Sequence, residues 1–320
     1  SREVYGLTEA KPVAAPMVKD GGQKLGDALD LLPAPAAKTY AQETGRMLYV
    51  AADRYDVMYC VRLLAQMISK PRRIDELRLK HLLKYLQGTA DWGWRYHYQD
   101  TPAEVQGFGD SDWAEDPITR RSVSSGYLIA GSHVWEFFCS GQQVVALSSA
   151  EAEFYAAGAV AARVLWFVYL MAELGGKIKG AVASDRSAAR GVCQRAGPGK
   201  IRHLQTRFLW LQERVAERAL RVFAVAGSEH GADIATKVLD GARVRMLALR
   251  IGLAPRGSSA VAAAVRMLLL FVLAGQVKAQ ETGTTIAVIA EEAYLVTEYG
   301  IYFSWAAVLK MAIFIAVLLM

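Results

Sequence analysis

The stretch Gly107-Phe-Gly-Asp-Ser-Asp-Trp113 ends a strand-like run on a group of carboxylates. Its acid Asp110 follows residues that alternate loosely between apolar and polar, as in a β-strand. Asp185 follows a second apolar strand-like run, Glu153 opens a long apolar helix-like run, and Asp233 opens a shorter one. Because strand ends and helix starts from distant parts of a sequence can converge, we expect these four carboxylates to meet at one point.

Such a group of acids indicates a particular chemistry. Converging carboxylates are the ligands that hard divalent cations prefer, Mg²⁺ above all. Two such ions can hold a phosphate for hydrolysis. The sequence therefore predicts a metal-dependent site that acts on a phosphate.

Size and charge set broad limits. The chain has 320 residues, enough for about two domains. Its net charge of +6 fits a polyanionic partner, although a solvated basic surface would account for it equally well. The cysteines Cys60, Cys139 and Cys193 lie far apart without a C-x-x-C spacing, which argues against a zinc site or a disulfide framework and suits a reducing compartment.

Six blocks in a fixed order carry a family resemblance, where any single block would be weak. They are Gly109-Asp-Ser-Asp-Trp-Ala-Glu-Asp116, Arg121-Ser-Val-Ser-Ser-Gly-Tyr127, Val145-Ala-Leu-Ser-Ser-Ala-Glu-Ala-Glu-Phe154, Ser184-Asp-Arg-Ser-Ala188, Arg202-His-Leu-Gln-Thr-Arg207 and Ala232-Asp-Ile-Ala-Thr-Lys-Val-Leu239. In this order the chain resembles the RNase H domain of copia-type retrotransposon Pol polyproteins. The resemblance implies an endonuclease that hydrolyses the RNA strand of RNA–DNA hybrids by two-metal-ion catalysis during reverse transcription.

The resemblance also implies a role for each acid. Asp110 bridges both ions, Glu153 and Asp185 hold one of them, and Asp233 holds the other. The implied cofactor is a pair of Mg²⁺ ions, with Mn²⁺ as the alternative metal.

Two of these assignments have competitors. Asp112 and Asp116 lie in the same segment as Asp110, which is favoured because the family's strand-end Asp precedes Ala-Asp-Trp. Glu151 lies two residues from Glu153, so the two acids point to different faces of a helix that is apolar almost all round. Similarity to the A-E-L-x-A of retroviral and cellular RNase H selects Glu153, which leaves Glu151 as an acid favoured by the helix dipole.

Three basic side chains are candidates for binding the substrate. Arg186 replaces the family's Asn, and its charge would either weaken metal binding or grip a phosphate. His203 would either touch the substrate or orient its helix through a hydrogen bond. Arg207 closes the same block. His230 does not match the mobile His of cellular RNase H, so we expect an ordinary loop residue there.

The resemblance implies an α/β fold, with an RNase H-like mixed five-stranded sheet and helices on both faces. We expect strands at residues 92–98, 105–110, 125–130, within 134–147, at 181–184 and at 221–226, and helices at 151–174, 187–195, 203–219 and 233–253. Ser148 and Ser149 are candidates to cap the first of these helices.

Composition divides the chain into four parts. Residues 1–40 are expected to be a linker at the end of the reverse transcriptase region, 41–90 a connection segment of two helices, and 91–253 the RNase H-like domain. Residues 254–320 are an apolar tail with one or two candidate transmembrane helices, at 260–277 and 301–320. Lys310 near the middle of the second run is costly in a membrane, and a spurious fusion or read-through is the other explanation of the tail.

The implied partners are an RNA–DNA hybrid, the upstream reverse transcriptase domain of the same polyprotein, and a membrane through residues 260–320. The Y-x-D-D hairpin of the polymerase site does not occur in this sequence, which begins with Ser1 as expected of a fragment or an incomplete gene model. We expect the nuclease region in the cytoplasm or nucleus, and at a membrane if the tail is genuine. Two alternatives stay open: a catalytically decayed relic that binds nucleic acid, and a membrane-anchored fusion protein.

Overall fold

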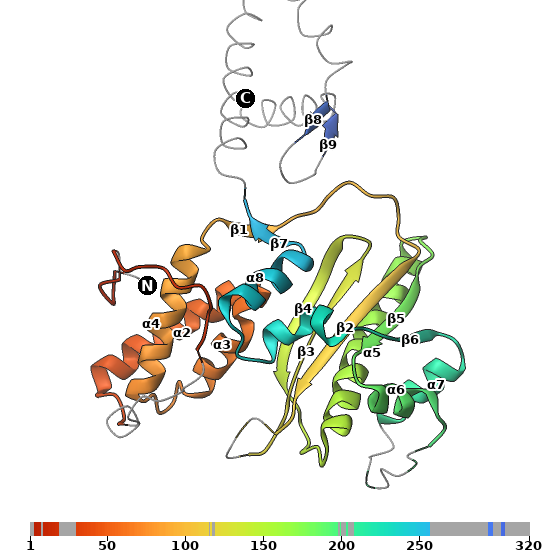
Figure 1. Cartoon of the computed structure of the whole chain (residues 1–320), viewed down its shortest axis with the longest axis horizontal. Coiled ribbons are helices and arrows are strands. Elements are labelled where there is room, and N and C mark those ends of the chain that lie inside the picture. Colours follow the sequence, from red (N-terminus) through yellow and green to blue (C-terminus); the bar gives the residue numbers. More distant parts are fainter. Residues whose placement is uncertain are drawn as a thin grey trace, which may run out of the picture. The chain divides into compact units, whose positions relative to one another are not determined.

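Five strands form one mixed sheet in the order β4-β3-β2-β5-β6 (Figure 1). The strands are β2 (Glu104–Asp112), β3 (Val123–Ala130), β4 (His133–Gly141), β5 (Lys179–Ser184) and β6 (Leu220–Ala224). β2, β3 and β4 form an antiparallel meander, whereas β5 pairs in parallel with both β2 and β6. The expected mixed five-stranded sheet is confirmed, and it shows the strand order and directions of an RNase H-like fold.

The computed structural model describes residues 3–7, 9–18, 30–114, 116, 119–197, 199, 203 and 208–256, and the backbone at 294–296 and 302–304. Its helices are α2 (Ala34–Ala51), α3 (Tyr55–Gln66), α4 (Arg73–Gly88), α5 (Ser149–Glu173), α6 (Ser187–Gln194), α7 (Trp210–Ala216) and α8 (Gly241–Arg250). Two 3₁₀ turns, η2 (Gly227–Glu229) and η3 (Gly231–Ala235), connect β6 to α8.

Helices cover both faces of the sheet, as expected. Successive residues of a strand point to opposite faces. On one face, Gly107 of β2 lies against Val160 of α5. On the other, Phe108 stacks on Tyr127 of β3 with ring centroids 4.9 Å apart, and Tyr127 meets Tyr55 of α3 edge-on at 6.0 Å.

α5 is the central helix of the core. Ser148 is its N-cap, and the Ser148 side chain accepts a hydrogen bond from the Glu151 amide at 3.2 Å, as the sequence predicts. The helix ends before Gly175, whose φ of +79° is a left-handed conformation that glycine adopts easily. Within the described part of the chain, α5 is the one helix whose length and composition would suffice to cross a membrane. Half of its apolar stretch is buried inside the protein, as expected of a core helix.

Bare glycine backbone lets α5 approach the sheet closely. A Cβ atom added to Gly107 would collide with Val160 and lie 2.6 Å from Cγ2 of Val164. The cross-strand pair of Gly109 and Gly126 meets the same Val160, with added Cβ atoms 2.8 and 2.6 Å from its Cγ2. Valine in a helix has one strongly preferred rotamer, so these side chains cannot turn aside cheaply.

Gly107→Ala should therefore destabilise the protein by about 1–3 kcal/mol or more, because it overpacks this contact. Gly158→Ala is the matched control, since Gly158 lies in α5 itself and an added Cβ there meets nothing within 4 Å. The control should stabilise the helix by about 0.5–1 kcal/mol. Chemical denaturation of both variants checks this, and equal effects would contradict close packing at β2.

The N-terminal helices correct one expectation. Residues 41–88 were expected to form two helices, but α2, α3 and α4 are three, and α2 begins at Ala34 inside the expected linker. Pro33 precedes α2 in an extended conformation, which suits proline before a helix. The sequence pattern does not separate α2 from α3 because the break between them is a single turn, at residues 52–54.

α3 is joined to the sheet by a buried polar chain. The Tyr55 hydroxyl donates to Oγ of Ser125 on β3 at 3.2 Å, and the Ser125 hydroxyl donates to the Ala232 carbonyl in η3 at 2.8 Å. Contacts of this kind unite residues up to 90 with residues 101–252 in one compact unit. The domain boundaries expected at 40, 90 and 253 stay predictions.

Tyr55 should accordingly matter to the stability of the whole unit. Its side chain is fully buried, so Tyr55→Ala should cost about 3–5 kcal/mol by leaving a cavity. Tyr55→Phe, which removes one hydrogen bond, should cost about 1 kcal/mol. Tyr49→Ala is the control, because Tyr49 on α2 is 81% exposed and should change stability by less than about 0.5 kcal/mol. Two separate unfolding transitions, with Tyr55→Ala shifting only one, would show that the N-terminal helices fold apart from the sheet.

A second unit contains residues 91–100 and the residues from 253 onward. In it, β1 (Trp92–Trp94) pairs antiparallel with β7 (Leu253–Pro255). The strand expected at 92–98 is thus shorter, and it pairs with β7 in a separate two-stranded sheet.

The structure corrects one further expectation, and another concerns residues that the structure does not describe. Residues 233–253 were expected to be mostly helical, but η3 and α8 are separated by a non-helical stretch at 236–240. The expected helices at 260–277 and 301–320 lie outside the described residues, except that 302–304 form strand β9 (Tyr302–Ser304), paired antiparallel with β8 (Tyr294–Val296).

Candidate active site

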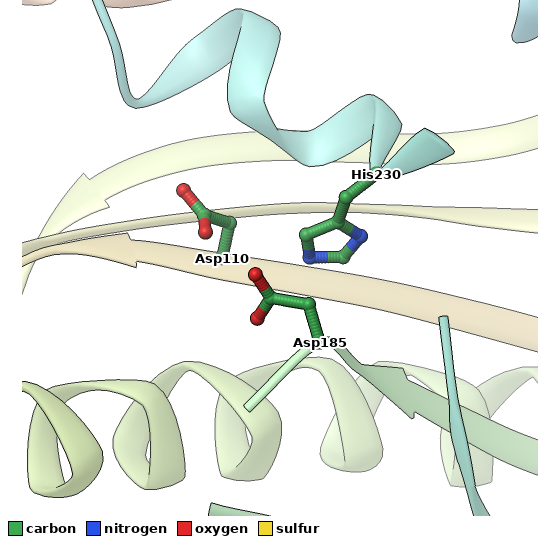
Figure 2. Close-up of side chains that lie close together, drawn as sticks. All are labelled: Asp110, Asp185 and His230. Atoms are coloured by element: carbon green, nitrogen blue, oxygen red, sulfur yellow. The ribbon is translucent and has the colours of Figure 1, made fainter. Parts of the chain in front are cut away.

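Two acids meet at the carboxyl ends of adjacent parallel strands. The register of β2 and β5 pairs Phe108 with Ala183. The same register continued by two residues places Asp110 opposite Asp185, and neighbouring strands lie about 4.8 Å apart. Asp110, Asp185 and His230 each offer a ligand atom within 4.8 Å of the others (Figure 2). The sheet thus brings together the two strand-end acids that the sequence singles out.

Asp110 is the most buried of these acids, at 1% exposure. Thr236 donates its hydroxyl hydrogen to Oδ2, and the Lys237 ammonium lies 3.2 Å from Oδ1. Burial raises the pKa of Asp110 above its ordinary value, although Lys237 and Thr236 act to lower it. The carboxylate is therefore held in surroundings that favour an added positive charge.

Glu153 reaches the same place from the first turns of α5. It is 2% exposed, and burial together with the charges of Asp110 and Asp185 raises its pKa to about 9. Its Oε2 atom is buried without a hydrogen-bond partner, and so is Oδ1 of Asp185. Buried carboxylate oxygens are normally hydrogen-bonded, so these two unpartnered oxygens suit a bound cation.

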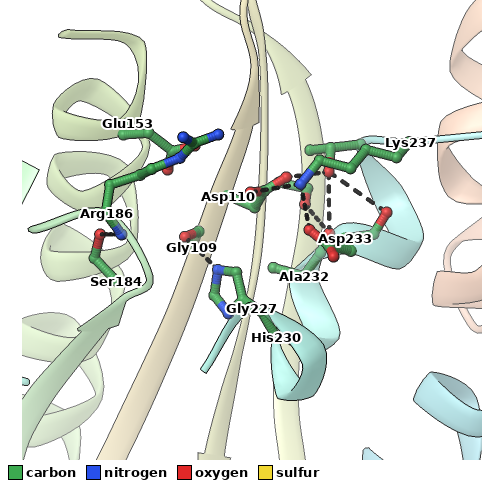
Figure 3. Close-up of polar contacts among 12 residues, drawn as sticks. Gly109, Asp110, Glu153, Ser184, Arg186, Gly227, His230, Ala232, Asp233 and Lys237 are labelled. Atoms are coloured by element: carbon green, nitrogen blue, oxygen red, sulfur yellow. Dashed lines mark hydrogen bonds and ion pairs between the residues drawn. The ribbon is translucent and has the colours of Figure 1, made fainter. Parts of the chain in front are cut away.

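Asp233 lies on the other side of Asp110 and differs in its surroundings (Figure 3). It is part of η3, where Lys237 forms an ion pair with Oδ1 and Arg243 lies 3.5 Å from Oδ2. Lys237 therefore contacts both Asp110 and Asp233. The sequence shows Lys237 as part of a motif but does not predict this role for it.

His230 has a place in the site that its sequence position did not predict. The side chain is completely buried, and Nε2 lies 2.9 Å from the Gly109 carbonyl oxygen. Because a carbonyl only accepts, Nε2 carries the hydrogen, and Nδ1 is buried without a hydrogen-bond partner. The sequence predicts an ordinary loop residue at this position, whereas His230 is buried and hydrogen-bonded within the site. Its position three residues before Asp233, at the cap of a tight turn, is the one signal that could have found it.

The competing glutamate, Glu151, has a different environment. Its carboxylate accepts hydrogen bonds from the hydroxyl of Tyr155, from the amide of Leu147 at 3.0 Å, and from Nε2 of His203 at 2.8 Å. Although burial acts to raise it, these hydrogen bonds hold the pKa of Glu151 below its ordinary value. Glu151 is fully engaged by protein groups, whereas Glu153 faces the other acids.

The two acids that compete with Asp110 also separate from it. Asp112 is half-buried near the end of β2, and burial with the charge of Asp110 raises its pKa. Oδ1 of Asp116 accepts from the Thr119 amide at 3.0 Å, which makes Asp116 a turn residue. Among the described acids of this segment, Asp110 is the one that meets Asp185.

Proteins of similar sequence are known from plant transposons. The chain is 28% identical over 251 residues to a retrovirus-related Pol polyprotein from transposon RE2 of Arabidopsis thaliana, a match over 77% of this chain and 17% of that protein. It is 27% identical over 246 residues to one from transposon TNT 1-94 of Nicotiana tabacum, over 74% of this chain and 18% of that protein. These homologues are retrovirus-related Pol polyproteins from plant transposons. The chain spans less than a fifth of the length of these two relatives.

No family model matches the chain. Among solved structures, an RNase H1 isolated from compost, LC11-RNase H1, is similar with a TM-score of 0.30 and 12% identity, over 41% of this chain and 91% of that one. The RNase H-like architecture of this chain is seen in the order and directions of its five strands.

The structure describes two of the three basic residues that the sequence predicts to bind substrate, Arg186 and His203. The Arg186 side chain is 55% exposed, and its Nε lies 4.0 Å from Oε1 of Glu153. His203 is bound to Glu151, which favours orientation of the helix over contact with a substrate. Arg207 lies outside the described residues.

The stabilising effects of Glu153 and Glu151 should respond oppositely to pH in metal-free buffer. Glu153 has a raised pKa, so the folded state binds an extra proton and stability falls as pH rises from about 4.5 towards 9. Glu153→Gln should therefore be more stable than wild type by more than about 1 kcal/mol at pH 8, with a gap that closes near pH 5. Denaturation across this pH range measures the gap.

Glu151→Gln is the control. The lowered pKa of Glu151 contributes stability above about pH 4.5 that is lost as pH falls through its folded value, so this variant should be less stable than wild type at pH 8. Destabilisation by both variants at pH 8 would show that Glu153 is not held at a raised pKa.

Proposed function

We propose that this chain is the RNase H part of a copia-type Pol polyprotein, hydrolysing the RNA strand of RNA–DNA hybrids. The observation that carries the proposal is the meeting of Asp110 and Asp185 at the ends of two strands. Glu153 of α5 lies near enough that their charges raise its pKa, and one oxygen each of Glu153 and Asp185 is left unpartnered. The sequence blocks and the relatives support the same reading.

The donor set fits divalent metal ions. All four acids offer oxygen ligands, which suit Mg²⁺, or Mn²⁺ as the alternative. Asp110 would be shared by two ions, Glu153 and Asp185 would hold one, and Asp233 would hold the other. Bound there, the ions supply activation of a water and stabilisation of the leaving oxygen of a phosphodiester.

The chain's own residues prepare the site for this chemistry. Burial raises the pKa values of Asp110 and Glu153, so the charged forms of both carboxylates would be stabilised by an added cation. The exposed guanidinium of Arg186, next to Glu153, is suited to grip a phosphate of the substrate. The hydrogen bond of His203 to Glu151 fixes the start of α5, which carries Glu153.

The remaining partners are proposals of the same kind. An RNA–DNA hybrid is the substrate, and an upstream reverse transcriptase domain is the neighbour in the polyprotein. A membrane contact through residues 260–320 and a location in the cytoplasm, the nucleus or at a membrane stay predictions.

One observation favours an alternative, nucleic-acid binding without cleavage. Arg186 stands where the family has Asn, and its charge next to Glu153 competes with a cation there. A hybrid-cleavage assay decides between the two, because a decayed relic would bind the hybrid in a salt-dependent manner and leave the RNA strand intact.

Asp110→Asn should reduce cleavage of an RNA–DNA hybrid in Mg²⁺ by at least about a hundredfold, because it removes charge and a shared ligand at almost constant volume. Asp112→Asn is the matched control, on the same strand and the same face, and should lose less than about tenfold. Circular dichroism checks that both variants are folded. Equal losses in the two variants, or wild-type cleavage by Asp110→Asn, would reject the assignment.

A plain DNA duplex of the same sequence is the substrate control, since the 2′-hydroxyls mark the strand to be cut. Cleavage of that duplex at a similar rate would point to a different nuclease on the same fold.

A further inference from the structure

The two sides of the acidic site differ in whether their carboxylate oxygens have partners. On the side of Glu153 and Asp185, one oxygen of each carboxylate is buried without a hydrogen-bond partner. On the side of Asp233, both oxygens have a basic side chain beside them, Lys237 at Oδ1 and Arg243 at Oδ2. The site therefore has unsatisfied oxygens that would accept a cation on one side and already contains positive charge on the other.

Lys237 lies where a bridging cation would lie. Its ammonium contacts Oδ1 of Asp233 and is 3.2 Å from Oδ1 of Asp110, so one positive group joins the two carboxylates (Figure 3). The Lys237 amide also donates to the Asp233 carbonyl at 3.1 Å, which fixes the base of the side chain on the same turn.

The side chain is nonetheless able to leave. It is 37% exposed, and lysine carries its charge on a flexible four-carbon stem. Asp110, by contrast, is held by its strand, and Asp233 by its turn. Of the groups in the Asp110–Lys237–Asp233 contact, the ammonium is the one that can withdraw without moving the backbone.

We propose that Lys237 is a resident cation that competes with the second divalent ion for Asp110 and Asp233. The first ion binds on the side of Glu153 and Asp185, and the second enters only as the ammonium withdraws. This inference rests on the proposed function, whose metal ligands it uses. It makes the two ions unequal: the first binds more tightly, and occupancy of the second site is set by Lys237.

Calorimetric titration of the full chain with Mg²⁺, repeated with Mn²⁺, tests this without any cleavage reaction. Wild type should show a tighter and a weaker binding step. Lys237→Met should strengthen the weaker step by about tenfold to a hundredfold, the effect of removing a charged hydrogen-bonded competitor, and should change the tighter step far less. Lys179→Met is the control, because Lys179 is exposed at the opposite end of β5 from Asp185 and its removal changes net charge equally.

Asp185→Asn provides the second comparison. It should weaken the tighter step and leave the effect of Lys237→Met on the weaker step in place. Thermal unfolding gives an independent readout: added Mg²⁺ should raise the melting temperature of Lys237→Met more than that of wild type, since ions that bind the folded state stabilise it. If Lys237→Met proves poorly folded, Lys237→Gln replaces it in both measurements.

The outcomes separate the two ideas. If wild type binds divalent ions but Lys237→Met leaves the weaker step unchanged or weakens it, Lys237 is a structural partner and the inference is overturned while the proposed function stands. If neither wild type nor Lys237→Met binds a divalent ion, the metal site of the proposed function fails, and the inference fails with it.

Discussion

The close packing of α5 on β2 is the contact on which the rest of the site depends. Gly107 and Gly109 present bare backbone to Val160, and Gly126 on the neighbouring strand does the same. This lets the helix axis lie nearer to the sheet than side chains at these positions would allow. The start of α5 is carried inward with it, and so is Glu153. Without this approach, the strand-end acids would meet one another but not the helix carboxylate.

That packing has an electrostatic cost. It crowds Asp110, Glu153 and Asp185 into a poorly solvated space, where the raised pKa values of Asp110 and Glu153 show that the charged forms are disfavoured. The packing itself is in the core of the protein, where Val160 and Val164 are fully buried. Glu151, only two residues away, differs because the protein itself supplies the hydrogen bonds to its carboxylate.

Much of this could be predicted from the sequence, for identifiable reasons. The strand-end position of Asp110, the Ser148 cap and the stop at Gly175 are local features, so spacing and residue type reveal them. The choice of Glu153 over Glu151 came from family resemblance, because an apolar helix gives periodicity nothing to distinguish.

The missed features are non-local or depend on side-chain geometry. β1 pairs with β7 across a long stretch of sequence, so no local pattern marks its partner. The burial of His230 follows from its hydrogen bond to Gly109, 121 residues away. The position of Lys237 between two acids depends on the 3₁₀ geometry of η3, which hydrophobic spacing alone does not distinguish from an α-helix.

η3 connects the site to the N-terminal helices, and this gives those helices a role beyond linkage. The turn carries Asp233 and precedes Lys237, and the Ser125 hydroxyl holds it through the Ala232 carbonyl. Ser125 is in turn held by Tyr55 of α3, and it pairs across the sheet with Asp110. Ser125 of β3 thus accepts a hydrogen bond from α3, outside the sheet, and donates one to η3. The side of the site that contains Asp233 and Lys237 is consequently shaped by α3 as much as by the sheet, whereas the side of Glu153 and Asp185 is shaped by the sheet and α5.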